Sequence, residues 1–398
     1  MNAKPDSVAS PSPTDPAQGQ PADALRSLIA QAITDGGGWL PFDRYMALAL
    51  YAPGLGYYSG GSRQFGQLAR DGSDFVTAPE LSPLFGRALA RQVEQALQAT
   101  GTDELWEFGA GTGALAAQIL QALDEHGALP RRYTIVDLSG ALRERQQRTL
   151  ARWADRVSVQ WASELPAELR GVVVGNEVLD AMPVKLLAWD GAQWLERGVA
   201  LSPAEPGDAA PAALSWSDRP TALRPPVDAP FPPGAVTEIH PQAQAFIRTL
   251  AERLAQGAAF FIDYGFPEAE YYLPQRHGGT LMCHRGHRAD ADPLADPGEK
   301  DLTAHVDFTG IALAGQDAGL TVLGYTTQAH FLLNCGLLDE LAGATAGLPE
   351  PQALAARAAA HRLVAEHEMG ELFKVIGFVR GAEFDAIGFA RGDRSHTL

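Results

Sequence analysis

The segment that most constrains this fold is a glycine loop at residues 107–113, which reads Glu-Phe-Gly-Ala-Gly-Thr-Gly. It follows an apolar run at Leu105–Phe108, which predicts a buried strand, and it opens Gly113–Leu123, whose apolar residues recur at helical spacing. Closely spaced glycines between a strand and a helix can bring a ligand against bare backbone amides at the helix N-terminus. The loop therefore predicts an α/β unit with a ligand site at its turn.

After Thr102 the chain alternates short strands with helices, a pattern that is typical of a parallel sheet with crossover helices. Further strands are predicted at Tyr133–Asp137, Val157–Trp161, Val172–Gly175 and Ala258–Asp263, and helices at Leu142–Trp153, Gln242–Ala255, Phe308–Ala318, Ala329–Leu341 and Pro351–Glu368. Strands at Thr321–Thr326 and Phe373–Val379 are predicted to close the sheet as an antiparallel pair. We therefore expect an α/β fold built on a mostly parallel sheet.

The length of 398 residues exceeds the size at which one hydrophobic core usually keeps growing, so an appended module is expected. We predict a disordered tail at residues 1–21, a helical N-terminal module at 22–101 and an α/β core at 102–398. The core is predicted to carry insertions at about 186–237 and 266–306.

The insertions differ in character. The first begins with a predicted β-hairpin, because Asp190-Gly191 favours the tight turns that match strand twist, and continues in a predicted long surface loop at Ser202–Pro233. The second, at Tyr271–His305, is rich in Gly, Pro, His and Asp and has little periodicity, so we predict an irregular lid. A glycine- and tyrosine-rich loop at 54–61 similarly interrupts the N-terminal module.

Composition limits the partners. The chain has 48 acidic and 31 basic residues and no long basic stretch, which disfavours binding to nucleic-acid phosphates and would favour a basic segment of a protein. Two cysteines suit a reducing compartment, and no apolar run approaches the roughly 20 residues of a membrane span. The first residues resemble neither a secretory signal nor a transit peptide. We expect a cytoplasmic protein without a membrane span.

Carboxylates at two strand ends help to choose the ligand. The glycines also fit a dinucleotide-binding pattern, or simple packing of strand against helix, so they leave the cofactor open. Glu107 would repel a pyrophosphate but suits the ammonium of a methionine-like group, which favours S-adenosylmethionine (SAM) over NAD. Asp137 can accept ribose hydroxyls of either cofactor. The predicted SAM site comprises Glu107, Gly109, Ala110, Gly111, Gly113, Asp137, Leu138 and Asn176.

A polar segment at Asn176–Pro183 follows the fourth strand at the same edge of the sheet. Glu177 and Asp180 could pair with a guanidinium and hold its nitrogen in line with a sulfonium, although the same segment could merely cap a helix. His305 could accept a proton from a substrate nitrogen or brace the lid, and Asp307 is a predicted helix N-cap. We predict Glu177, Asp180 and His305 as the catalytic residues.

A metal site is not predicted. His277, Cys283, His284 and His287 superficially resemble zinc ligands. The adjacent Cys283 and His284 would point apart on extended backbone, and zinc normally needs four ligands that converge.

Taken together, these segments resemble the MidA family, whose mitochondrial members are called complex I assembly factor 7. The shared segments follow the family order and are Ser73–Ser82, Glu107–Gly113, Asn176–Val184, Ile262–Gly265, Asp301–Phe308 and Phe373–Ile376. Thr77–Glu80 and Thr303–Asp307 are the most specific of them. Asp137 departs from the family pattern, since many relatives have Glu there, and the change keeps a ribose contact feasible.

The resemblance implies a class I (Rossmann-like) SAM-dependent methyltransferase fold. It also implies a protein arginine methyltransferase that acts on a complex I-type subunit. It assigns Thr77, Pro79 and Glu80 to the substrate or cofactor cleft and Asn176, Glu177 and Asp180 to the methyl-transfer point. Asp263, Tyr264 and Asp307 are further predicted cleft residues. The alternatives are an assembly factor that keeps the SAM fold but lacks catalysis or acts on a small molecule, and an NAD-dependent oxidoreductase.

Overall fold

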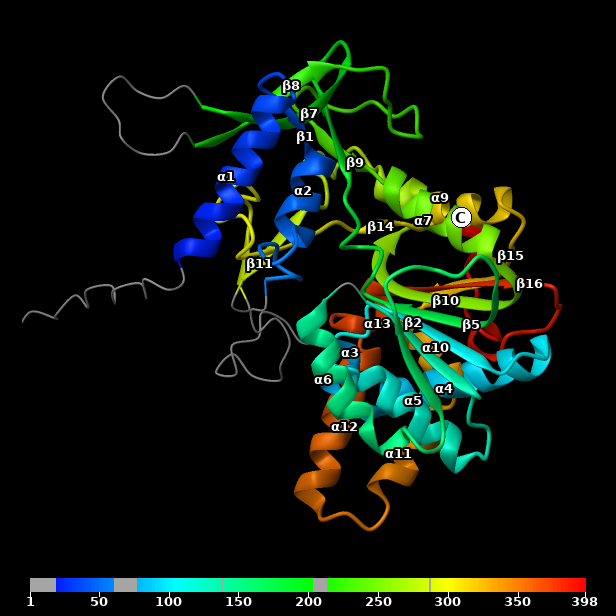
Figure 1. Cartoon of the computed structure of the whole chain (residues 1–398). Coiled ribbons are helices and arrows are strands. Elements are labelled where there is room, and N and C mark those ends of the chain that lie inside the picture. Colours follow the sequence, from blue (N-terminus) through cyan, green and yellow to red (C-terminus); the bar gives the residue numbers. More distant parts are fainter. Residues whose placement is uncertain (1–18, 61–76, 138, 203–212, 286–287) are drawn as a thin grey trace, which may run out of the picture.

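The computed structural model describes residues 19–60, 77–137, 139–202, 213–285 and 288–398 (Figure 1). Several predictions lie wholly or partly outside these residues. They concern the tail up to residue 18, the end of the loop at 54–61, the segment Ser73–Val76, the cofactor residue Leu138, positions 203–212 of the surface loop and His287.

A large sheet forms the centre of the molecule, with strand order β15-β16-β10-β5-β2-β3-β4. Its strands are β2 (Glu104–Phe108), β3 (Arg132–Val136), β4 (Ser158–Ala162), β5 (Leu169–Asn176), β10 (Leu254–Phe266), β15 (Thr321–Thr327) and β16 (Phe373–Arg380), and the short β14 (Val306–Asp307) pairs with the end of β10. The strands from β10 to β4 run parallel, whereas β16 is antiparallel to both β10 and β15. The predicted mostly parallel sheet with an antiparallel pair is confirmed.

Helices cover both faces of this sheet because its central strands are apolar on both sides. Val172, Val173 and Val174 of β5 are all fully buried. One face packs on α4 (Pro83–Thr100) and α5 (Ala114–Glu125), and the other on α7 (Pro241–Arg253) and α9 (Phe308–Asp317) (Figure 1). The helix α6 (Gly140–Leu150) follows β3 and continues in a 3-10 turn at Ala151–Trp153.

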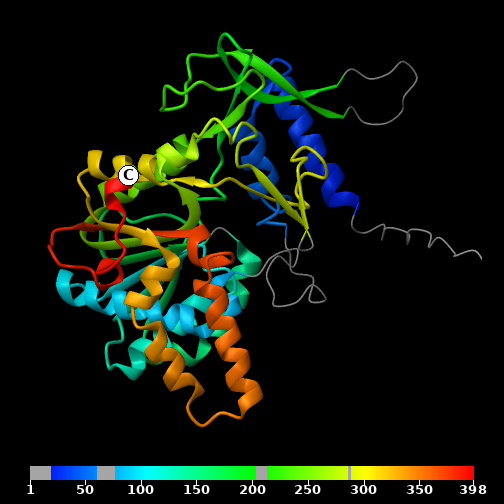
Figure 2. The same cartoon turned by 180° about the vertical axis from the view of Figure 1, so that it is seen from behind.

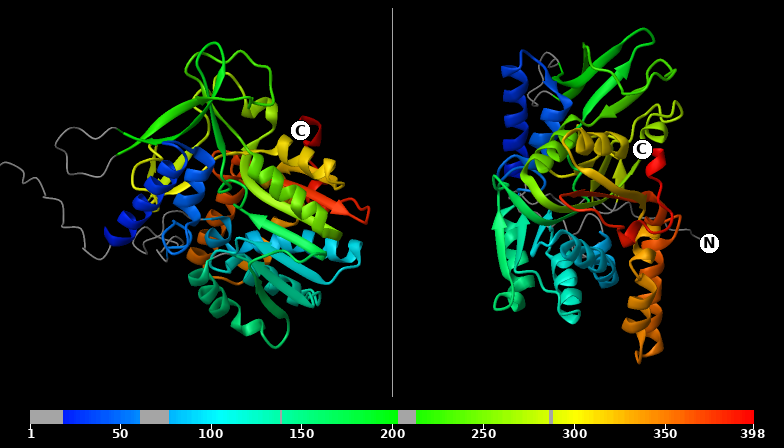
Figure 3. Two further views of the ribbon diagram at one scale, coloured as in Figure 1. Left: turned by 45° about the horizontal axis from the view of Figure 1, so that its top comes forward. Right: turned by 90° about the vertical axis from the view of Figure 1, so that its right-hand side faces the viewer.

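A second, antiparallel sheet lies beside the first, with order β1-β7-β6-β9 and β8 paired to β7 (Figure 3). Its strands are β1 (Leu40–Pro41), β6 (Lys185–Trp189), β7 (Trp194–Leu201), β8 (Leu214–Pro220) and β9 (Val236–Ile239), and it shares a core with α1 (Gly19–Asp35) and α2 (Phe42–Tyr51). The predicted hairpin is confirmed as β6 and β7. Helix α4 also lies within residues 22–101, but it packs in the core of the large sheet and not in the core of α1 and α2. A helical module with limits at 22–101 stays a prediction.

Part of the first insertion was predicted wrongly as a loop. Residues 214–220 form β8, which pairs with β7 along its whole length. The apolar residues Leu214 and Trp216 alternate with serines, and the Trp216 ring packs 5.5 Å from that of Phe42. That partner is remote in the sequence, so the alternation alone carried too little signal.

The second insertion is also more regular than predicted. It contains α8 (Glu268–Tyr271) and a small sheet of β12 (Arg288–Asp290), β11 (Met282–Arg285) and β13 (Asp301–Thr303). The prediction of an irregular lid was wrong. These strands have only three or four residues each, which is too few for a periodic pattern to show in the sequence. Cys283 and Leu302 anchor the sheet in the core of α1 and α2.

The C-terminal helices depart from prediction at one point. The single helix predicted at Ala329–Leu341 is two helices, α10 (Gln328–Asn334) and α11 (Leu337–Thr345), because Gly336 adopts a left-handed φ of 81° between them. The helices α11 and α12 (Glu350–Val364) form a pair that projects from the body of the protein (orange in Figure 2), and α13 (Met369–Leu372) leads into β16. Among the described helices, none combines the length and apolar character of a membrane span.

Candidate active site

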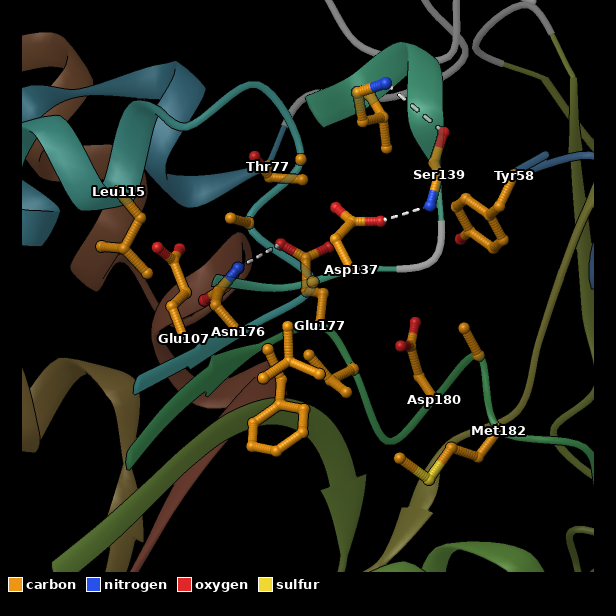
Figure 4. Close-up of a pocket in the computed structure, with 18 of the residues that line it drawn as sticks. Tyr58, Thr77, Glu107, Leu115, Asp137, Ser139, Asn176, Glu177, Asp180 and Met182 are labelled. Carbon is orange, nitrogen blue, oxygen red and sulfur yellow. Dashed lines mark hydrogen bonds between the residues drawn. The ribbon is translucent and has the colours of Figure 1, made fainter. Parts of the chain in front are cut away.

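A cavity of about 940 Å³ lies at the carboxyl ends of β2, β3 and β5, the edge at which open α/β sheets bind ligands (Figure 4). Most of the predicted site residues line it, namely Thr77, Pro79, Glu80, Glu107, Gly109, Ala110, Gly111, Asp137, Asn176, Glu177, Asp180, Tyr264 and His305. Gly113, Asp263 and Asp307 are absent from this lining, within the described residues.

The glycine loop turns through a conformation that favours glycine at three positions. Gly109, Gly111 and Gly113 have φ values of 63°, 51° and 82°. A Cβ atom on Gly109 would lie 3.1 Å from Val178 of the neighbouring loop. Gly113 is the N-cap of α5. The backbone of the loop is therefore exposed to a ligand while its far side is packed.

Glu107 points into this cavity from β2 and is almost fully buried. It accepts a hydrogen bond from the Tyr133 hydroxyl at 2.7 Å. Burial raises the pKa of Glu107 to about 8, and the bond from Tyr133 only partly opposes that rise. A cation bound against Glu107 would favour its carboxylate form. The residue therefore fits the ammonium group of a methionine-like ligand.

Asp137 is held at the end of β3 by two donors. The backbone amide of Ser139 donates at 2.9 Å and the side-chain amide of Gln146 at 2.7 Å. Gln146 also donates to the carbonyl of Gly111 at 3.0 Å. This fully buried glutamine of α6 ties the carboxylate to the glycine loop. Sequence reasoning missed it, and the signal was a polar residue on the buried side of a helix.

The segment that the family resemblance singled out is the short helix α3 (Ala78–Leu81), and it is fastened to both neighbours. Thr112 of the glycine loop donates its hydroxyl to Glu80. Gln118 of α5 donates to the carbonyl of Pro79 at 2.7 Å. On the other side, the backbone amide of Ala78 hydrogen-bonds the Glu177 carboxylate.

The loop after β5 is shaped by a carboxylate beneath it. Asp263 of β10 is fully buried, and one of its oxygens accepts the backbone amides of Val178, Leu179 and Asp180 at 2.9–3.2 Å. Glu177 has a φ of 53°, which is uncommon for a residue other than glycine and stores strain. Asp263 thus acts as a support for the loop that presents Glu177 and Asp180 to the cavity.

The acidic groups of this loop differ in exposure, since Asp180 is buried and Glu177 is partly buried. Burial raises the pKa of Glu177 to about 8, and nearby Asp180 adds to the rise. Burial also raises the pKa of Asp180, whose Oδ2 accepts the Tyr264 hydroxyl. Asp180 Oδ1 and Asn176 Oδ1 find no hydrogen-bond partner among the described residues. These atoms are acceptors that a donor-rich ligand would satisfy.

His305 lines the same cavity as this loop. Its ring stacks on Phe266, with centroids 5.3 Å apart and planes at 3°, and meets the edge of Tyr264. Burial, followed by the nearby charges of Arg276 and Lys374, lowers the pKa of His305 to about 4. The imidazole is therefore neutral near pH 7, and its Nδ1 has no partner within the described structure.

Two tyrosines that sequence reasoning missed complete the wall. The Tyr51 hydroxyl donates to the carbonyl of Ala181 at 2.7 Å, and that of Tyr58 donates to Asp301 at 2.9 Å. Their rings stack at 5.6 Å. Asp307 instead caps α9 by accepting the amide of Gly310 at 3.1 Å, as predicted. The aromatic loop before residue 60 was the available signal for Tyr58, whereas Tyr51 is the last residue of α2.

The sheet order, the glycine loop and the carboxylates at the ends of β2 and β3 define a class I SAM-dependent methyltransferase. Residues 88–326 match a family model described as "Putative S-adenosyl-L-methionine-dependent methyltransferase". The chain belongs to this family, and the MidA-like assignment made from the sequence is confirmed.

Known proteins agree with this assignment. A crystal structure of a candidate methyl transferase from Burkholderia thailandensis, bound to S-adenosyl-homocysteine (SAH), is 51% identical, with a TM-score of 0.90 over 98% of this chain and 100% of that one. A protein named protein arginine methyltransferase NDUFAF7, mitochondrial, from Homo sapiens is 27% identical over 81% of this chain and 75% of its own. The homologue from Caenorhabditis elegans is 26% identical over 75% of this chain and 73% of its own. SAM is thus the cofactor, as predicted.

Proposed function

We propose that this methyltransferase transfers the methyl group of SAM to an arginine side chain of a protein. The observation that carries the proposal is a pair of buried oxygen atoms, Asn176 Oδ1 and Asp180 Oδ1, that accept no hydrogen bond among the described residues and lie beside the carboxylate of Glu177. No lysine or arginine lines the cavity in the described part of the chain. A guanidinium brings five N–H donors and a permanent positive charge, which matches this set of groups.

The cofactor end of the cavity suits SAM. The backbone of the glycine loop at Gly109–Gly111 and the carboxylates of Glu107 and Asp137 would hold it. When bound, it supplies a methyl group on a sulfonium, whose transfer to nitrogen depends mainly on alignment and charge. The protein's share of the reaction is therefore to orient the nitrogen and to stabilise the cation.

Glu177 and Asp180 would pair with the guanidinium, because desolvated carboxylates that lack a cation gain most from one. The cation would lower the pKa of both groups and keep them ionised. Neutral His305 offers Nδ1 as a hydrogen-bond acceptor, and after transfer it can take the proton that the methylated nitrogen loses. Tyr264, through its bond to Asp180, would keep that carboxylate oriented.

The names of two relatives support arginine as the methyl acceptor. The proteins from Homo sapiens and Caenorhabditis elegans are named protein arginine methyltransferases, at 26–27% identity. The complex I-type subunit implied by the family resemblance and a cytoplasmic location stay predictions.

The test is transfer of radiolabelled methyl from SAM to proteins of a host lysate, followed by mass spectrometry of the labelled protein. We expect label on arginine with the wild-type protein and a greatly reduced label with Asp180→Asn. Label on lysine or on a small molecule would contradict the arginine assignment. Unlabelled lysate in the presence of a protein that binds SAH would instead favour an assembly factor without catalysis.

A further inference from the structure

A buried carboxylate of the second sheet lies behind the cavity wall. Glu238 of β9 is fully buried, and its oxygens accept the backbone amides of Thr280, at 2.9 and 3.1 Å, and of Leu281, at 3.1 Å. Gly279 has a φ of 75°, and a Cβ there would lie 2.3 Å from Glu238 Oε1. Successive amides turned towards one anion form a tight backbone nest that requires this glycine.

Three further side chains complete a closed hydrogen-bond network around Glu238. The Tyr271 hydroxyl donates to Glu238 at 3.0 Å and lies 2.9 Å from that of Thr280. His240 Nε2 lies 3.0 Å from the same tyrosine oxygen. Because the single tyrosine proton goes to the carboxylate, the imidazole must be the donor in this contact, which suits a neutral ring. A fully satisfied buried network of this kind specifies one arrangement of the chain.

The network reaches two walls of the cavity through one hydroxyl. Thr280 precedes β11, whose residues Met282 and His284 line the cavity. The Thr280 hydroxyl also accepts the backbone amide of His305 at 3.1 Å. Thr280 itself is absent from the cavity lining that the structure describes. The Thr280 side chain thus links the β11 wall to the histidine, in addition to the pairing of β11 with β13.

We propose that Glu238 is a positioning residue for the acceptor side of the active site, acting through Thr280 on Met282 and His305. The inference rests on the proposed function only in that this wall faces the methyl acceptor. The contacts that hold Glu107 and Asp137 come from other residues, Tyr133, Ser139 and Gln146. Loss of the network should therefore slow transfer and leave cofactor binding unchanged.

The decisive variant is Thr280→Val, which keeps the side-chain shape and removes the hydroxyl. The full chain has five methionines, so ¹³C-methyl labelling of methionine gives a simple spectrum. Met282 reports the β11 wall, and Met182, which lines the same cavity, reports the loop after β5. In Thr280→Val we expect the Met282 signal to shift or broaden, the Met182 signal to stay, and the SAH dissociation constant to change less than about twofold.

Methyl transfer to lysate proteins should fall about tenfold to a hundredfold in Thr280→Val, because small displacements of aligned groups have effects of this size. Thr280→Ser restores the hydroxyl and should restore both the Met282 signal and transfer. Tyr272→Phe is the matched control. Tyr272 is buried like Tyr271, but its hydroxyl donates only to the backbone carbonyl of Glu238, at 3.1 Å. The Met282 signal and methyl transfer should therefore both remain as in wild type.

An unchanged Met282 signal and wild-type transfer in Thr280→Val would overturn the proposal, as would an equal loss of SAH binding and transfer. If this variant does not fold, Tyr271→Phe decides, since it removes one donor to Glu238 and should shift the Met282 signal to a smaller extent. No shift there would also overturn the proposal. The two proposals can fail separately. Label on a residue other than arginine would contradict the proposed function, but it would not change the Met282 and Met182 signals that test the role of Glu238.

Discussion

The two ends of the cavity are built by different principles. At the cofactor end, Asp137 and the glycine loop are already hydrogen-bonded by the protein, and the supporting residues belong to neighbouring elements of the large sheet. At the acceptor end, Asn176 and Asp180 keep acceptor atoms without partners among the described residues, and the walls come from the second insertion and from Tyr51 and Tyr58 near the N-terminus. One end is complete before its ligand arrives, and the other needs its ligand to be satisfied.

The difference shows which property each end controls. A satisfied, rigid site suits a cofactor that is the same in every turnover. Desolvated carboxylates discriminate against neutral ligands, because leaving such groups unpaired is unfavourable while pairing them with a cation is not. The acceptor end is therefore expected to determine specificity, and the two ends should respond separately to substitution.

The largest expected effect separates the ends most sharply. Asp180→Asn should lower methyl transfer by about 100-fold, the scale seen when one oriented electrostatic contact is lost from an active site. The SAH dissociation constant should stay within about twofold of wild type when measured by calorimetry, because Asp180 belongs to the acceptor end. An equal loss of both properties would mean that the two ends are not independent.

A matched pair of variants tests the same division from the other end. Glu107→Gln should weaken SAH binding by about tenfold to a hundredfold, since a charged hydrogen bond contributes about 1.5–3 kcal/mol. Its transfer rate at saturating SAM should remain near wild type. Glu177→Gln makes the same chemical change across the cavity, and there we expect reduced transfer with nearly unchanged SAH binding. Identical behaviour of the two variants would refute the division.

The pH dependence of SAH binding should follow Glu107. Its pKa is raised to about 8 by burial, so in the free protein the group is largely protonated below that pH. The ammonium of the ligand prefers the carboxylate, so binding should release a proton and tighten as the pH rises towards about 8. The slope can reach at most about tenfold per pH unit. Calorimetry in buffers of different ionisation enthalpy measures the proton directly, and Glu107→Gln should remove the slope.

The smallest effect concerns support of the cofactor end. Tyr133→Phe removes the hydroxyl that donates to Glu107 and should raise the SAH dissociation constant about threefold, in line with about 0.5–1 kcal/mol for one net hydrogen bond. Transfer at saturating SAM should not change. A drop in the maximal transfer rate would show that the support extends into the acceptor end.

The cofactor end could largely be predicted from the sequence because its parts are contiguous. The glycine loop, Glu107 and Asp137 lie within about thirty residues, and each lies at or just after the end of a strand that its apolar run reveals. Gln146 escaped prediction because only the folded helix turns it towards Asp137.

The acceptor end could be predicted only in part. Glu177, Asp180 and His305 were found as polar residues next to apolar runs, and the structure brings them to one cavity. Tyr51, Tyr58 and the wall around Met282 were not found, because their partners lie far away in the chain. Tyr58 bonds Asp301, for example, across 243 positions. Short strands such as β11 gain their stability from such remote contacts, and local patterns do not register them.

The pairing of β1 with β7 has a consequence for the order of folding. Leu40 pairs with Val199, so the strand that covers α1 and α2 is synthesised long after those helices leave the ribosome. The segment from β2 to β5, by contrast, contains the glycine loop and can begin to assemble from contacts close in sequence. Nascent chains should therefore begin to assemble the strands around the glycine loop before the second sheet can close on α1 and α2.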